Sequence, residues 1–273
     1  MKTTFIFIEI AVLAAMTSAA RGNPRALPFT YTTDTLVDGA VEIEQYVDLV
    51  PQRALTETHP TNPGEWLLQT GFQTELEIGI ADRLELGLYF TFVPSPGPDY
   101  QGLGELPGVG NGIKQRLRYI FADPNEWPID VGVYGELTEL SNELEVEGKL
   151  LLQKRFGNLR IAANLSAEYE FYFSKERTLV PNPSLGATYE VSPKLHLGVD
   201  SFLRAEYQQY PKGEPSTFSH GPAAYVGPVV MMNFGKLWWS VGAYRRVTDF
   251  SHELVPGDSF GPYWVRSMLG YDL

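Results

Sequence analysis

Apolar and polar residues alternate along twelve stretches of this chain, and this alternation constrains the fold more than any other feature. Between residues 84 and 93, leucine and phenylalanine occupy every second position, with Glu85, Gly87, Tyr89 and Thr91 between them. A strand directs successive side chains to opposite faces, so a period of two predicts a strand with one apolar and one polar face. No helical pattern fits these stretches.

The connections between the stretches alternate in length. A minimal turn at residues 81–83 is followed by a connection from Pro94 to Gly110 that is rich in glycine and proline. The predicted strands span about residues 40–50, 66–80, 84–93, 112–121, 129–138, 143–154, 159–172, 184–191, 195–207, 222–234, 237–247 and 262–273. With both chain ends in the periplasm, the short connections are periplasmic and the longer ones external, except near residues 139–142. This pattern predicts a single closed antiparallel barrel of about twelve strands, of the kind that spans bacterial outer membranes.

The N-terminus has the features of a secretory signal peptide. Lys2 supplies a positive charge, residues 5–13 form a short apolar run, and small residues allow cleavage after about Ala19 or Ala20. We therefore expect residues 1–20 to be a cleaved signal peptide and residues 21–39 an extended periplasmic N-terminal lead. Residues 40–273 are expected to form the outer-membrane barrel.

Composition limits the classes of function. The 273-residue chain has a formal net charge of −12 and a pI of about 4.8, which disfavours nucleic acid as a partner. The chain has no cysteine, so a disulfide framework or thiolate metal site is excluded. We expect no cofactor. The expected partners are outer-membrane lipids, lipopolysaccharide, the barrel-assembly machinery that reads the last strand, and a small-molecule solute.

Charge separates cleanly between the two faces of the predicted strands. The polar faces carry the acids and bases, whereas a lysine or arginine at mid-bilayer would cost about 2–4 kcal/mol. This favours lipid outside and charge inside, although a soluble β-sandwich with a dry core would also separate the two. The residues predicted to line the lumen are Glu42, Glu44, Glu75, Glu77, Glu85, Lys114, Arg116, Arg118, Asp130, Glu136, Glu145, Glu147, Lys149, Arg160, His196, Asp200, Arg204 and Arg266.

Two groups of these residues face each other in the prediction. The acidic wall is formed by Glu42, Glu44, Glu75, Glu77 and Glu85, and the basic ladder by Lys114, Arg116 and Arg118. Together they would set a field across a pore and orient polar or zwitterionic solutes. The alternative is that Glu85, Asp130 and Glu136 on neighbouring strands neutralise the bases and leave a lumen plugged by salt bridges. Both interpretations remain open from the sequence.

Two segments carry a resemblance to a known kind of protein. Residues 39–46 (GAVEIEQY) and residues 73–89 (QTELEIGIADRLELGLY) resemble uncharacterised proteobacterial outer-membrane barrels, which are similar to transporter-like barrels of phenol-degradation pathways. The resemblance implies a porin-like channel or transporter. No catalytic residue comes with it, so none is carried over.

Two other functions remain as alternatives. An outer-membrane hydrolase, such as a phospholipase, needs a serine activated by a positioned histidine. The chain has His59, His196, His220 and His252 but no His-x-Ser-Asn-Gly motif. A structural or adhesive surface barrel with a plugged lumen is the third possibility. We assign no catalytic or metal-binding residue and favour passage of small hydrophilic or aromatic solutes.

Overall fold

The computed structural model describes residues 22–53, 66–92, 112–140, 143–209, 217–247 and 261–273, and these form strands, turns and one irregular N-terminal stretch. Within these ranges, no helix is long and apolar enough to cross a membrane. The predicted signal peptide lies outside the described residues, as do most of the external connections, His59 and His252.

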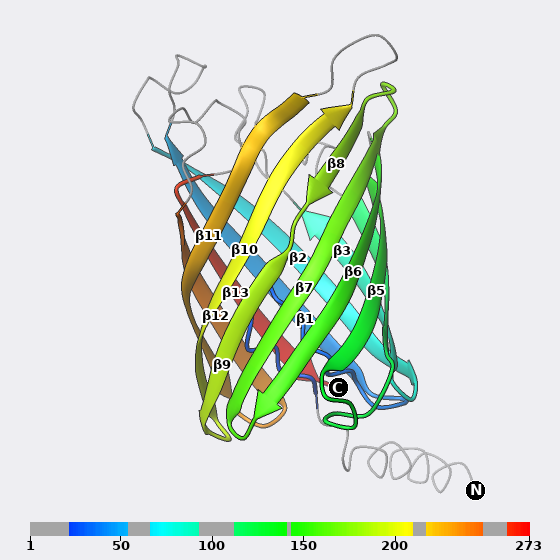
Figure 1. The fold of residues 1–273 in the computed structure, drawn as a ribbon, viewed down its shortest axis with the longest axis vertical. Coiled ribbons are helices and arrows are strands. Elements are labelled where there is room, and N and C mark those ends of the chain that lie inside the picture. The colour runs from blue at the N-terminus through cyan, green and yellow to red at the C-terminus, as the bar shows by residue number, and fades with distance from the viewer. Residues whose placement is uncertain (1–21, 54–65, 93–111, 141–142, 210–216, 248–260) are drawn as a thin grey trace, which may run out of the picture.

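The strands form one closed antiparallel barrel (Figure 1). Their bounds are β1 Val41–Arg53, β2 Trp66–Ala81, β3 Leu84–Phe92, β4 Gly112–Ile120, β5 Asp130–Leu140, β6 Glu143–Phe156, β7 Leu159–Tyr172, β8 Arg177–Pro181, β9 Ser184–Ser192, β10 Leu195–Gln209, β11 Thr217–Asn233, β12 Leu237–Arg246 and β13 Tyr263–Asp272. Strands that are neighbours in sequence pair with each other, except that β8 and β9 each pair with β7 and β10 instead, and β13 pairs with β1 to close the ring. Because β8 and β9 both lie between β7 and β10, the ring has twelve strand positions. The predicted all-β barrel is confirmed.

Tight turns join β2 to β3, β6 to β7, β9 to β10 and β11 to β12, and they lie at the same end of the barrel as the C-terminus (Figure 1). We call this the turn end. The opposite end, where β1 ends and β2 begins, is the loop end.

The structure adds one strand, β8, to the twelve that the sequence predicted. The sequence predicted one strand at residues 184–191, but the chain also pairs earlier, as β8. Asn182 and Pro183 separate β8 from β9, because proline has no N–H to donate and interrupts the ladder. Proline is nevertheless tolerated within β11, where Pro228 is paired with Val199 of β10.

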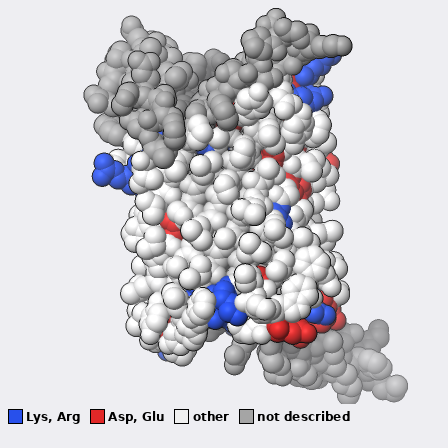
Figure 2. Space-filling view, viewed as in Figure 1, with Lys and Arg blue, Asp and Glu red and all other residues white. Residues whose placement is uncertain are grey.

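The two faces of the barrel wall differ in polarity. Leu117, Leu165 and Val199 are more than half exposed on the outer face, together with many other large apolar side chains. On the face that Figure 2 shows, charged side chains are few and scattered over a largely uncharged wall. The inner face carries the buried acids and bases. The sheet therefore separates an apolar exterior from an ionic interior, the reverse of a soluble barrel with a dry core.

The sequence assigned residues 21–39 to an extended periplasmic lead, and the structure shows where the described part of this stretch lies. Residues 22–40, which we call the N-terminal segment, run inside the barrel, and most of their side chains are buried. In Figure 1 this segment is the dark blue trace seen behind the strands toward the turn end. Polar groups on the inner wall bind it, and these contacts define the candidate site.

Candidate functional site

The N-terminal segment enters the lumen at the turn end and leaves it there. The backbone N–H of Gly22 donates to Asp272 at 2.9 Å, and that of Asn23 donates to Glu42 at 2.8 Å. On the returning limb, the N–H of Leu36 donates to Glu85 at 2.8 Å. The segment is thus a loop held at its base by carboxylates of the wall.

Asp200 and Asn164 make the shortest bonds to the backbone of the apex of the loop, residues 28–31. Asp200 on β10 accepts the backbone N–H of Phe29 at 2.9 Å and the hydroxyl of Thr30 at 2.6 Å. Asn164 on β7 accepts the N–H of Tyr31 at 2.7 Å and donates to its carbonyl at 2.9 Å. These bonds give the buried backbone of the apex the partners that it needs away from water.

Aromatic packing fixes the same apex. The ring of Phe29 stacks on Phe202 with centroids 3.7 Å apart and meets the edges of Tyr244 at 5.1 Å and Trp264 at 5.5 Å. The guanidinium of Arg266 lies 3.9 Å from the Phe29 centroid on a further side. Such ring and cation–π contacts add to the free energy of area burial.

A glycine on the wall makes room for the segment. Leu27 is buried at 1% exposure beside Gly186 of β9. A Cβ at Gly186 would lie 2.6 Å from a Leu27 methyl group and 2.9 Å from an Asp200 carboxylate oxygen. Any larger residue at position 186 would therefore displace the segment or its anchor.

Tyr31 lies among the basic side chains of the lumen. The guanidinium of Arg25 sits 3.8 Å from its ring centroid, and those of Arg116 and Arg118 sit 5.7 and 5.6 Å away. The Tyr31 hydroxyl meets that of Tyr89 at 3.1 Å. The segment thus places an aromatic face and one additional cation in the centre of the ionic interior.

The acidic wall and the basic ladder meet at Arg116. Its Nη2 atom lies 3.0 Å from Glu75, 2.7 Å from Glu77 and 2.6 Å from Glu85. The Nη2 atom of Arg118 also contacts Glu85, at 2.6 Å. All of these side chains are fully buried, so each charge depends on its partners rather than on water.

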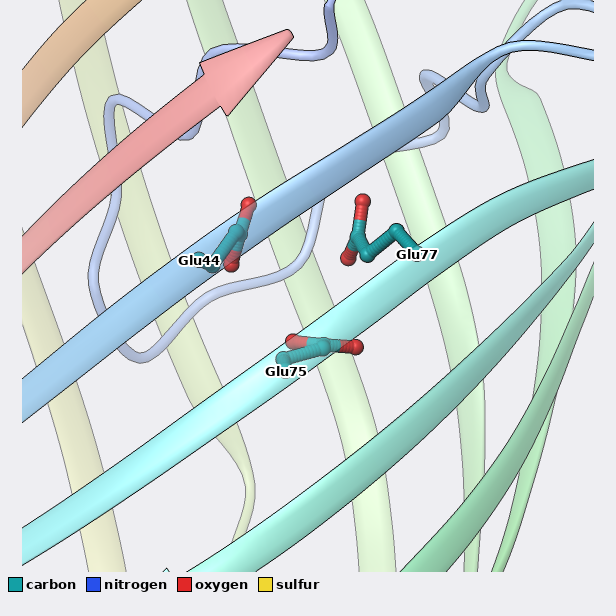
Figure 3. Close-up of side chains that lie close together, drawn as sticks. All are labelled: Glu44, Glu75 and Glu77. Carbon is teal, nitrogen blue, oxygen red and sulfur yellow. The ribbon is translucent and has the colours of Figure 1, made fainter. Parts of the chain in front are cut away.

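Three carboxylates of the acidic wall converge in Figure 3, which shows Glu44 on β1 with Glu75 and Glu77 on β2. Their spacing resembles a cation site, but guanidinium groups already contact them. Arg116 binds Glu75 and Glu77, and Arg25 lies 3.6 Å from Glu44. We therefore describe this cluster as an ion-pair network.

The returning limb of the segment carries its own acid. Asp34 forms ion pairs with Arg155 of β6 and with Arg160 of β7, the latter at 2.7 Å. The N–H of Thr33 approaches the side-chain oxygen of Gln153 at 3.4 Å. Arg25 and Asp34 therefore complement opposite charges on the wall, at two separate places along the segment.

The part of the lumen between the apex and the loop end is less filled by side chains than the part near the turn end. Lys114 pairs with Glu136 at 3.2 Å, and Lys149 pairs with Glu147 at 2.5 Å. Two cavities of about 180 and 200 Å³ open here, and both are lined by Gln73 and Lys114. Phe29 and Tyr31 line the first of them, so the apex of the N-terminal segment closes this cavity on one side.

All the residues predicted to line the lumen are buried or half-buried. The buried ones are Glu42, Glu44, Glu75, Glu77, Glu85, Arg116, Arg118, Asp130, Glu136, Glu147 and Asp200. The half-buried ones are Lys114, Glu145, Lys149, Arg160, His196, Arg204 and Arg266.

The structure does not bring all of them into one group. Arg266 forms a bidentate pair with Asp48 at 2.7 and 2.8 Å, and Arg204 lies 3.8 Å from Glu168. Asp130 accepts the N–H of Asn125 in the β4–β5 connection at the turn end.

Sequence reasoning missed the residues that the segment contributes. Arg25, Phe29, Tyr31 and Asp34 were included in a polar lead, and Asn164 was given no role as an anchor. A signal was present, because Leu27, Phe29 and Tyr31 are apolar at every second position, as in the strands.

The comparisons with known proteins concern the fold. No protein-family model matches the chain, and no curated protein matches its sequence. The barrel is similar to the NanC porin, with a TM-score of 0.56, 9% identity, and coverage of 86% of this chain and 100% of that chain. OmpT of Vibrio cholerae (TM-score 0.42, 10% identity, 89% and 100% coverage) and a mutant of the TodX monoaromatic hydrocarbon channel (0.42, 9%, 93% and 96%) are more distant. The likeness to the NanC porin concerns the closed antiparallel barrel fold.

Proposed function

We propose that the chain is an outer-membrane channel or transporter for small polar solutes. The observation that carries the proposal is the separation of an apolar exterior from an ionic, partly hollow interior. In a porin-like barrel, such an interior offers water and polar solutes a path through the bilayer. The likeness in fold to the NanC porin supports this proposal.

The membrane setting is part of the proposal. We infer that acyl chains cover the outer face, with lipopolysaccharide and phospholipid as partners and the turn end in the periplasm. The predicted signal peptide and the assembly machinery would bring the chain there. Export and folding into vesicles of outer-membrane lipids test this setting.

A charge placed on the outer wall is expected to destabilise the barrel most at the middle of the membrane and least near its surfaces. Leu165→Arg, in the middle of β7, should destabilise the folded barrel in vesicles by about 2–4 kcal/mol. Phe156→Arg, at the turn end, is the matched control and should cost about 0–1 kcal/mol because the group reaches the interface. Urea unfolding in vesicles measures both. Equal losses in the two variants would contradict a lipid-covered exterior.

Conductance tests the channel itself. The purified full chain, folded in detergent and added to a planar bilayer, should give discrete current steps in a simple salt. Detergent added without protein serves as the negative control. A chain that is folded and inserted but gives no current would contradict passive passage.

The second candidate is a structural or adhesive barrel whose lumen is closed. The observation that favours it is the N-terminal segment, which fills the turn half of the lumen with buried contacts. The conductance measurement separates the two candidates, because a permanently closed barrel gives no current in any variant that keeps its fold.

A further inference from the structure

We propose that residues 22–36 are a tethered blocking peptide and that the inner wall of the barrel is its reversible binding site. This inference rests on the proposed channel function, which it deepens by naming what closes the path. The ligand of the site is an extended segment of this chain, held by polar side chains and an aromatic pocket.

The way in which the segment is bound allows it to leave. Among the described residues, no backbone–backbone hydrogen bond joins residues 22–36 to a strand. Its backbone is bound instead by side chains, among them Glu42, Glu85, Asn164 and Asp200. Pro24 and Pro28 have no N–H and cannot join a ladder. Release of the segment therefore breaks no bond of the barrel wall, and every ladder remains closed.

The connection to the barrel is exposed. Val37, Asp38 and Gly39 are exposed, in contrast to the buried Leu36 and Ala40 on either side. Gly39 has a φ of 78°, which glycine adopts at no steric cost, and a Cβ there would meet nothing within 4 Å. The chain can change direction at this position while β1 keeps its pairing with β2 and β13.

The interior remains stable in contact with water after release. Arg25 leaves Glu44, and Asp34 leaves Arg155 and Arg160, so charged groups of both signs become available. In a water-filled lumen these groups are solvated, which offsets much of the lost pairing. An apolar wall would have no such alternative, so the ionic lining is compatible with both a closed and an open state.

The apex lies where it would meet a solute. Phe29 and Tyr31 separate the cavity of about 180 Å³ from the filled turn half of the lumen. The receptor surface for the apex is formed by Asp200, Asn164 and the aromatic ring of Phe202. A free peptide with the sequence of residues 22–36 presents the same groups and should bind the vacated wall.

The experiment compares three chains in planar bilayers. They are the full mature chain, a chain that begins at residue 37, and a full chain with Asp200→Ala and Asn164→Ala. The shortened chain and the double variant should conduct several-fold more than the full chain. Glu139→Gln, which changes an exposed acid of β5, is the control and should leave the current unchanged. The double variant serves as the second test if the shortened chain does not fold.

The synthetic peptide provides the second measurement. Added to the shortened chain, the peptide of residues 22–36 should return the current to the level of the full chain, and a scrambled peptide should not. Fluorescence anisotropy of a labelled peptide reports binding to the folded barrel without any current. Tighter binding of the true sequence than of the scrambled one is expected.

The outcomes separate this inference from the channel proposal. Equal currents in the full and loosened chains, with no preference for the true peptide, would overturn the blocking role and leave the channel function standing. If no chain conducts, the channel function fails. Selective binding of the true peptide would then support the reversible site, whereas its absence would overturn that site as well.

Discussion

Arg116→Met should lower the free energy of unfolding by about 3–5 kcal/mol, because it removes one partner from a buried ionic network. Nη2 of Arg116 contacts Glu75, Glu77 and Glu85 within 3.0 Å, and all four side chains are fully buried. Methionine fills a similar volume but supplies no charge. The wall then keeps three carboxylates with Arg118 and Arg25 as the nearest cations.

Urea unfolding in lipid vesicles, followed by tryptophan fluorescence, measures this loss. Arg83→Met is the matched control, because Arg83 pairs with Asp82 in an exposed turn, where an ion pair contributes about 0–1 kcal/mol. Adding Glu75→Gln and Glu77→Gln to Arg116→Met should restore part of the stability by removing uncompensated charge. A loss no larger than that of Arg83→Met would show that the network does not stabilise the barrel.

The strands could be predicted because each one is recognised from the alternation of its own residues. Alternation along residues 84–93 fixes which side chains share a face, and the tight turn at Arg83 fixes the pairing of β2 with β3. Each strand needs only its own residues and its neighbours for this assignment. Strand β8 was missed because it is short and is separated from β9 by Asn182 and Pro183, so its alternation does not extend far enough to be recognised.

The occupant of the lumen was not predictable in the same way. The alternation along its strand correctly places Asp200 on the inner face. Nothing next to it in the sequence indicates that it binds Phe29 and Thr30, which are about 170 positions away. Prolines and threonines made the N-terminal segment resemble a solvated lead. The alternation of Leu27, Phe29 and Tyr31 would have indicated burial of this segment only if it were already known that a segment of the chain occupies the lumen.

The sequence also could not show whether the charges of the lumen set a field across a pore or neutralise one another, because this depends on which side chains of different strands meet. Arg116 and Arg118 do contact the acidic wall, as the plugged alternative expected. Lys114 pairs with Glu136, which that alternative also named, but this pair lies nearer the loop end, beside the open cavities. Register between strands decides which acid reaches which base, and a single-strand pattern does not contain that register.

Phe29→Ala should weaken docking of the N-terminal segment more than any other single change in it. The ring packs against Phe202, Tyr244 and Trp264 and lies under the guanidinium of Arg266. Truncating such a buried aromatic side chain costs about 3–5 kcal/mol, which corresponds to an increase of roughly 10²–10³-fold or more in the population of the released segment. Global stability should fall much less, because the barrel ladders do not include this residue.

The absence of cysteine from the chain makes this release measurable. Thr32 is buried at 4% exposure within the segment, so Thr32→Cys gives a single thiol that a hydrophilic maleimide reaches only after release. The labelling rate follows the population of the open form when closing is fast. Phe173→Ala, in the exposed turn between β7 and β8, is the matched control and should leave the rate unchanged. If Phe29→Ala labels no faster than that control, the apex does not determine whether the segment stays in the lumen, and the lumen wall must bind the segment mainly through its charged base.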